Sequence, residues 1–364
     1  MPSSLRRPRR LSFLLVLLAL LVGASAAAAK PAPRPPDRSR LGTLDTGFRD
    51  SVREGRPPRS VRKATLHAAR YGGAYPVAGG QSVRVFLSDA YEPDDEVNQA
   101  WAEFFASLTH RLELSRVTVY IAPLGEMHNL CGQGSDACYF PSDHTLVFTV
   151  DPLGDGSSAE EAAVHEYGHH VAEYRRNDVG PAGDWGPEYW ATYEEVCWLE
   201  GQGRAFPGAE GVNYARNPGE AWAETFRVLN AYAPGAWPII APIFRPDQRA
   251  LGLARRDVVN PYRGGRTIER SGQFKKGGSR WREFVVPIQN DGTVDVRVAG
   301  GGTLDADIYI YAPNGKTKLD SSTANGRNER YRDNYCGYRQ LDIAVYRYSG
   351  TGTFKLTAKL PFFS

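Results

Sequence analysis

The residues of this chain that are best suited to chemistry lie in one short segment, His165-Glu166-Tyr167-Gly168-His169. Helical residues four positions apart project from one face, so the imidazoles of His165 and His169 can reach a single metal ion. Glu166 then lies beside that ion, where its carboxylate can take a proton from water. We predict that the two histidines bind one catalytic Zn²⁺ and that Glu166 is a general base. The alternative is a buried helix whose histidines only bind neighbouring groups.

A second segment, residues 217–226, can complete such a site. A catalytic zinc has three protein ligands and one position left for water. Asn217 can cap a helix that has Pro218 in its first turn, which places Glu220 and Glu224 one turn apart on the same face. We predict that Glu220 is the third metal ligand and that Glu224 accepts a hydrogen bond from a ligand histidine. The alternative is that Glu220 only stabilises the first turn of its helix.

These two motifs together, H-E-x-x-H and then N-P-x-E-x-x-A-E-x-F, resemble the gluzincin superfamily of zinc peptidases, and within it the compact lethal-factor-type domains. The resemblance covers roughly residues 80–230 and depends on the two motifs. It implies a tyrosine shortly before the glutamate ligand that stabilises an oxyanion, a position that Tyr214 matches. Tyr214 packing against the start of the helix is the alternative. The metzincin pattern does not fit, because Ala172 and Arg175 stand where it requires glycine and histidine.

The first motif lies in a stretch with strong helical signals. Ser158 followed by Glu161 forms a capping box, which predicts that a helix begins just ahead of the metal ligands. Apolar residues three and four positions apart give this helix a stripe on the side away from the two histidines. The stripe consists of Val164, Tyr167, Val171 and Tyr174. His170, the neighbour of His169, is turned away from the shared face and is expected to form a hydrogen bond elsewhere.

The region ahead of that helix mixes helical and strand patterns. Alternating runs predict strands at residues 83–87, 117–121 and 146–150, and a helix from about 96 to 112 separates the first two. The predicted fold over residues 63–262 is therefore an α+β, zincin-like catalytic domain with a small sheet packed on the H-E-x-x-H helix. The resemblance implies that an edge strand binds the substrate backbone, and we expect the run 146–150 to be that strand.

The N-terminus has the features of a secretory signal. Four arginines precede an apolar run and then an alanine-rich stretch, which predicts a signal peptide over residues 1–29 and a secreted protein without a membrane span. The proline- and arginine-rich residues 30–62 are predicted to be a disordered leader or a pro-segment. After loss of residues 1–29 the chain has 40 basic and 41 acidic residues, a net charge of −1. That balance gives no electrostatic reason to expect nucleic acid as a partner.

The four cysteines of a secreted protein suggest two disulfides. Cys131 and Cys138 are close in sequence and are the expected local pair. Cys197 and Cys336 would then join the two halves of the chain, although both could instead be buried thiols.

From residue 268 the pattern changes to short alternating runs separated by Asn-, Gly- and Pro-containing turns, which predicts an all-β sandwich over residues 268–364. The segment Leu304 to Tyr309, with the Pro-Asn-Gly turn that follows, resembles a motif of the prepeptidase C-terminal domain of secreted bacterial proteases. Asp305 and Asp307 offer oxygen ligands for Ca²⁺, and the competing interpretation is that they are surface aspartates of a strand.

The combined prediction is a secreted zinc metalloendopeptidase that acts on a protein or peptide substrate. Its alternative is a secreted binding or adhesion protein in which the metal is not catalytic and the β-sandwich carries the function. A zinc enzyme that cleaves a non-peptide amide is a third option, because the ligands do not define the substrate. The sequence does not determine the substrate, the oligomeric state or any activation by pro-segment removal.

Overall fold

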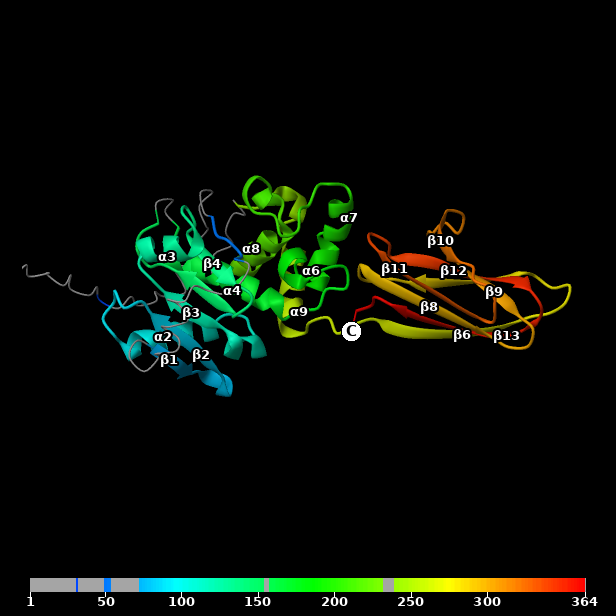
Figure 1. Ribbon diagram of the computed structural model, residues 1–364, viewed down its shortest axis with the longest axis horizontal. Coiled ribbons are helices and arrows are strands. Elements are labelled where there is room, and N and C mark those ends of the chain that lie inside the picture. Colours follow the sequence, from blue (N-terminus) through cyan, green and yellow to red (C-terminus); the bar gives the residue numbers. More distant parts are fainter. Residues whose placement is uncertain (1–30, 32–48, 54–71, 154–156, 232–238, 364) are drawn as a thin grey trace, which may run out of the picture.

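The structure is a computed structural model that describes residue 31 and residues 49–53, 72–153, 157–231 and 239–363. The predicted signal peptide and most of the predicted leader lie outside the described residues. Figure 1 shows two regions along the long axis of the molecule, a mixed region of helices and strands and a C-terminal region of strands. No described helix is long and apolar enough to cross a membrane.

A five-stranded sheet forms the base of the mixed region, with the strand order β1-β2-β3-β5-β4. Its strands are β1 (Gly72–Pro76), β2 (Ser82–Leu87), β3 (Thr118–Ile121), β4 (Ala137–Phe140) and β5 (Thr145–Phe148). The three central strands, β2, β3 and β5, run parallel, and an antiparallel strand closes each edge. Every residue of β3, β4 and β5 is buried, as expected for strands that are covered on both faces.

The prediction that the run 146–150 is an edge strand is wrong. That run forms β5, which lies between β3 and β4. The short segment Ala137–Phe140, which alternation did not mark as a strand, folds back antiparallel to β5 and takes the edge. Four residues are too few to show a period clearly, and the turn after Phe140 is needed to bring β4 onto the sheet.

Helices cover the sheet and carry the two sequence motifs. They are α2 (Asp95–Ala106), α3 (Leu124–Cys131), α4 (Ala159–Glu173), α5 (Ala182–Trp185), α6 (Glu188–Tyr193), α7 (Val196–Gly201), α8 (Pro218–Asn230) and α9 (Gln248–Val259). Short 3₁₀ turns lie at Ala78–Gly80, Leu112–Arg116, Gly211–Arg216 and Pro242–Phe244. The helix predicted from about 96 to 112 ends earlier, at Ala106, because the hydroxyl of Ser107 donates to the Phe104 carbonyl and closes the last turn.

Both predicted helix starts are present. Ser158 and Glu161 form the capping box of α4, and the Asn217 side chain accepts from the Gly219 amide at the start of α8. Val164, Tyr167 and Val171 of the predicted stripe are buried in the core, where Tyr167 contacts Phe105 of α2 and Phe226 of α8, while Tyr174 is the half-buried C-cap of α4. The capping chemistry and the apolar stripe therefore fix where α4 begins and which face it turns to the core.

The helices α4 and α8 lie in close contact because of a glycine. A Cβ atom at Gly168 would lie 2.9 Å from the Ala223 Cα atom, so no larger residue fits there without separating the helices. The Trp222 indole also donates to the Gly168 carbonyl over 2.9 Å. This packing brings the second motif to within side-chain reach of the first.

The C-terminal β region (residues 266–360) consists of two four-stranded antiparallel sheets, β10-β9-β12-β7 and β11-β8-β13-β6. Its strands are β6 (Arg266–Phe274), β7 (Trp281–Pro287), β8 (Gly292–Gly300), β9 (Asp305–Tyr311), β10 (Lys318–Ser322), β11 (Asn328–Tyr335), β12 (Gln340–Ser349) and β13 (Gly352–Leu360). Alternate residues of both sheets, among them Val296, Ile308 and Ile343, form one apolar core. The alternating runs in the sequence therefore do lie on strands.

Both predicted disulfides are present. Cys131 pairs with Cys138 beside β4, and Cys197 of α7 pairs with Cys336 of the C-terminal β region. Near the second disulfide, Arg339 donates to the Asp291 carboxylate over 2.7 Å and to the Thr192 carbonyl over 3.2 Å. The two regions are thus joined by a covalent bond and by polar contacts. These disulfides are compatible with an oxidising compartment.

Candidate metal centre

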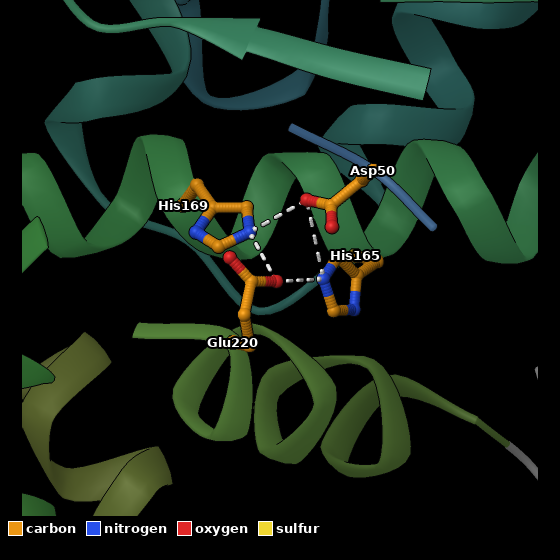
Figure 2. A group of neighbouring side chains, drawn as sticks. All are labelled: Asp50, His165, His169 and Glu220. Atoms are coloured by element: carbon orange, nitrogen blue, oxygen red, sulfur yellow. Dashed lines mark hydrogen bonds and ion pairs between the residues drawn. The ribbon is translucent and has the colours of Figure 1, made fainter. Parts of the chain in front are cut away.

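Two helices and one extended segment place four ligand atoms around one point (Figure 2). His165 and His169 project from the same face of α4, and Glu220 reaches them from the first turn of α8. The Glu220 Oε2 atom lies 3.1 Å from His165 Nε2 and 3.3 Å from His169 Nε2. All three side chains are buried. The structure thus brings the three predicted ligands together.

The fourth group is Asp50, which the sequence analysis did not identify. Its Oδ2 atom lies 3.1 Å from His169 Nε2 and 3.6 Å from His165 Nε2. Asp50 comes from residues 49–53, which lie along β4 and form an isolated parallel bridge between Val52 and Tyr139. These five residues belong to the stretch 30–62 that was predicted to be a disordered leader or a pro-segment, and their pairing with β4 could not be seen in the sequence.

The four ligand atoms fit a small divalent cation. All lie within 4.8 Å of one another. Zinc bonds of about 2.0–2.1 Å in a tetrahedral site place neighbouring ligand atoms about 3.3 Å apart, and the four distances given above run from 3.1 to 3.6 Å. Two carboxylates and two imidazoles also supply the charge and the donor types that zinc takes. Within the described ranges no second group of this kind occurs, and Asp305 and Asp307 are not part of this one.

The carboxylates and histidines of the site shift one another's pKa values in opposite directions. Burial alone would raise the pKa of the Glu220 carboxyl, but His169 and His165 outweigh burial and hold that pKa well below its usual range. Burial would lower the pKa of His169, yet the Glu220 and Asp50 carboxylates raise it well above the ordinary histidine value. The two carboxylates therefore favour positive charge at this point, which a divalent cation would supply in place of protons.

Glu166 lies next to the ligand cluster and is fully buried. Burial, followed by the nearby Asp50 charge, raises the pKa of Glu166 well above the usual glutamate value. A hydrogen bond shared with Asp50 also contributes to this rise, so Glu166 lies against the ligand cluster with its carboxyl directed at Asp50.

Tyr214, from the 3₁₀ turn Gly211–Arg216, points into the same space. Its hydroxyl donates to Asp50 Oδ1 over 2.5 Å. Burial and then the Asp50 charge raise the pKa of Tyr214 well above its ordinary value, so the phenol remains a hydrogen-bond donor. The predicted role of Tyr214 as an oxyanion donor requires such a proton, and the structure places that proton at the ligand cluster.

Glu224 lies behind the cluster. Its Oε2 atom is 3.8 Å from His165 Nδ1, the distance of an ion pair rather than of a direct hydrogen bond. Arg227 holds both Glu224 oxygens at 2.7 Å. Burial would raise the pKa of Glu224, but Arg227 outweighs burial and lowers it. Glu224 thus faces the ligand histidine as an anion, and Arg227, which the sequence analysis missed, fixes its orientation.

His170 does not belong to the cluster, as predicted. Its Nε2 atom bonds to the Glu113 carbonyl over 2.9 Å and its Nδ1 atom to the Tyr139 hydroxyl over 3.0 Å. Burial lowers its pKa to about 3. His170 therefore remains neutral and links α4 to β4.

No protein-family model matches the chain, and no curated protein is significantly similar to it. Among solved structures, the pre-peptidase C-terminal domain of a collagenase from Bacillus anthracis is 20% identical, with a TM-score of 0.23, over 26% of this chain and 89% of that one. A periplasmic inhibitor of g-type lysozyme from Aeromonas hydrophila, PliG, is 14% identical, with a TM-score of 0.21, over 26% and 87%. The Yersinia pseudotuberculosis-derived mitogen is 11% identical, with a TM-score of 0.22, over 28% and 90%. Likenesses this weak carry no argument about activity, and the family stays unassigned.

Proposed function

We propose that this protein is a zinc-dependent hydrolase that cleaves peptide bonds. The observation that carries the proposal is the buried group of His165, His169 and Glu220 with the carboxylate of Glu166 beside it. Ligand distances of 3.1–3.6 Å support a zinc ion, and we propose that Glu166, which lies beside the ligands, is the base. Secretion and a role of the C-terminal β region outside catalysis belong to the same proposal.

Zinc bound there would act as a Lewis acid that acidifies a water molecule and polarises the carbonyl under attack. Glu166 would take the proton from that water and later return it to the leaving amine. The Tyr214 hydroxyl would donate to the oxygen on which negative charge develops. Glu224, held by Arg227, would fix the orientation of the neutral His165 ring and keep its proton on Nδ1, so that Nε2 faces the metal.

The choice of a peptide as substrate follows from β4. This strand lies at the edge of the sheet, and its outer side already pairs with an extended stretch of chain at residues 49–53. An edge that takes one extended chain next to the metal centre can take another by strand addition. Cleavage of a non-peptide amide would make no use of this edge.

A second candidate function is favoured by Asp50. A structural zinc site has four protein ligands and no position for water, and Asp50 with the three predicted ligands makes four. The protein would then be a secreted binding protein in which the metal only stabilises the fold. The fully buried Glu166, which lies beside the ligands in the H-E-x-x-H segment, has no role in that candidate, which is why we place it second.

The proposal is tested by metal content and casein hydrolysis on the purified chain and its Glu166→Gln variant. We expect about one zinc per chain in both proteins, and hydrolysis that falls by a factor of about 10²–10⁴ in the variant. Glu173→Gln, an exposed position on the same helix, is the matched control and should keep wild-type hydrolysis. Equal hydrolysis by wild type and Glu166→Gln would exclude Glu166 as the base, and the absence of zinc would exclude the metal site. If wild-type hydrolysis is too low to measure, the same comparison is made in a variant that also carries Asp50→Ala.

A further inference from the structure

We propose that residues 49–53 are an internal inhibitor of the metal centre, with Asp50 in the ligand position that substrate and water would otherwise use. This inference rests on the proposed function and adds its regulation. The segment would keep the chain latent until it leaves the site. Its support comes from the backbone of the segment, the Asp50 side chain and the place of the segment in the chain.

The backbone of the segment occupies the outer edge of β4. The Tyr139 amide donates to the Ser51 carbonyl over 3.1 Å, and the Arg53 amide donates to the Tyr139 carbonyl over 2.7 Å. One end is fixed by Asp136, whose amide donates to the Arg49 carbonyl over 2.6 Å and whose carboxylate accepts from the Arg49 amide over 2.8 Å. These bonds occupy the backbone amide and carbonyl groups on the outer edge of β4, with which an extended substrate would have to pair.

The Asp50 side chain occupies the groups that would act on a substrate. Its Oδ2 atom faces the two ligand histidines, and its Oδ1 atom accepts from the Tyr214 hydroxyl. One carboxylate thus takes both the remaining position at the metal and the donor proposed for the oxyanion. Asp50 is buried with only 5% of its surface exposed, so a substrate carbonyl cannot enter while the segment is in place.

Contacts beyond Asp50 also hold the segment against the fold. The Arg49 guanidinium lies 5.4 Å from the centre of the Tyr214 ring, and the Ser51 hydroxyl donates to the Cys131 carbonyl over 3.1 Å. Val52 is half-buried and packs against the apolar core of the mixed region. No described helix or strand includes the five residues, so their release would cost the Val52 packing and the edge bonds of β4 but no hydrogen bond within a described helix or between the described strands.

The test measures access to the metal, because access does not depend on finding a substrate. Acetohydroxamate, a small bidentate zinc ligand, is titrated calorimetrically into zinc-loaded protein that retains residues 49–53. We expect Asp50→Ala to bind it at least about tenfold more tightly than wild type, with zinc content unchanged. Asp143→Ala, in the turn between β4 and β5, is the matched aspartate control and should behave as wild type.

A second variant leaves all the ligands in place. Arg53→Pro removes the amide that donates to Tyr139, so it should loosen the segment and increase acetohydroxamate affinity in the same direction as Asp50→Ala, by a smaller factor. Casein hydrolysis is measured on the same samples and should rise in both variants.

The outcomes separate this inference from the proposed function. Loss of zinc in Asp50→Ala, or equal acetohydroxamate affinity in wild type and both variants, would overturn the inhibitor. Measurable casein hydrolysis by wild type that equals that of Asp50→Ala would also overturn the inhibitor, while the peptidase proposal would stand. If Asp50→Ala keeps its zinc and binds acetohydroxamate more tightly than wild type but cleaves no peptide, the peptidase proposal is excluded. The inference that Asp50 blocks the metal centre is then still supported. If the wild-type protein binds no zinc, both the inhibitor inference and the peptidase proposal are excluded.

Discussion

The mixed region and the C-terminal β region differ in the kinds of side chain that they bury. The interior of the mixed region contains many ionisable groups, including His165, Glu166, Glu220, Glu224 and Arg227, all with no exposed surface. The core shared by the two C-terminal sheets is formed by apolar and aromatic side chains such as Val296 and Ile343. A buried charge is costly unless it is paired or bound to a metal. The mixed region buries further ionisable groups away from the metal centre, such as Glu194 and Asp257, but it is at the metal centre that two histidines and two carboxylates meet at one point.

Removal of the metal should give the largest difference between the unfolding temperatures of the two regions. A chelator removes a ligand that binds only the folded state, and structural zinc sites contribute about 10 kcal/mol or more of folding free energy. We expect the unfolding transition of the mixed region to fall by many degrees, while that of the C-terminal β region stays in place. Differential scanning calorimetry with and without chelator checks this, and re-addition of zinc serves as the control. Two transitions that fall together would mean that the regions unfold as one unit.

The next largest effect is expected from Arg227→Ala. This change leaves the buried Glu224 carboxylate unpaired, which costs about 3–5 kcal/mol for a buried ion pair. Arg330 forms a comparable two-bond contact with Asp295, at 3.1 and 2.7 Å, but on the surface of the C-terminal β region. Arg330→Ala should cost far less, because solvent screens an exposed ion pair. Urea unfolding of both variants measures the difference, and equal losses would contradict the importance we give to burial.

Ile343→Ala tests the region whose stability depends on apolar packing. Ile343 is fully buried in β12, and truncation of such a side chain costs about 2–5 kcal/mol. We expect the unfolding free energy of the C-terminal β region to fall by that amount, while zinc affinity and Glu166-dependent hydrolysis stay unchanged. A simultaneous loss of zinc affinity would show that the metal centre depends on the C-terminal core.

Gly168→Ala should have a smaller effect on stability and a specific effect on the metal. The added Cβ would meet Ala223 Cα at 2.9 Å, and such overpacking costs about 1–3 kcal/mol. Because α4 and α8 carry the ligands, their separation should also weaken zinc binding. Gly252→Ala in α9, where a Cβ would meet nothing within 4 Å, is the control and should stabilise by about 0.4–1 kcal/mol. Zinc titration and thermal unfolding distinguish the two glycines.

Most of what could be predicted from the sequence is local. The capping box at Ser158 and the cap at Asn217 act within one turn of helix, so neighbouring residues suffice to locate α4 and α8. The pairing of Cys131 with Cys138 spans only seven residues. Alternation placed β8, β9, β12 and β13 of the C-terminal β region but not β6, β7, β10 and β11, because only a strand with a regular buried face shows its period directly. His170 was correctly separated from His169 by helical geometry alone.

The parts that failed depend on distant residues. The position of β5 inside the sheet is decided by the pairing of β4 along its outer side. The end of α2 at Ala106 is the exception, because the Ser107 hydroxyl closes that turn locally. Arg227 was missed because an arginine at the end of a helical motif gives no sign that it will be buried. The leader was judged from its composition, which describes a tendency to remain unfolded and does not include the edge of β4 on which residues 49–53 lie.

The sequence by itself determined that His165, Glu166 and His169 share one helical face and that Glu220 lies in the first turn of another helix. Helical spacing and capping need no other part of the chain. Only the tertiary structure decided that these two helices meet at Gly168, and that Asp50, 115 residues before His165, lies against the same histidines. The physical reason is that the positions of ligands from separate segments depend on which edges and faces are buried together, and no local pattern contains that information.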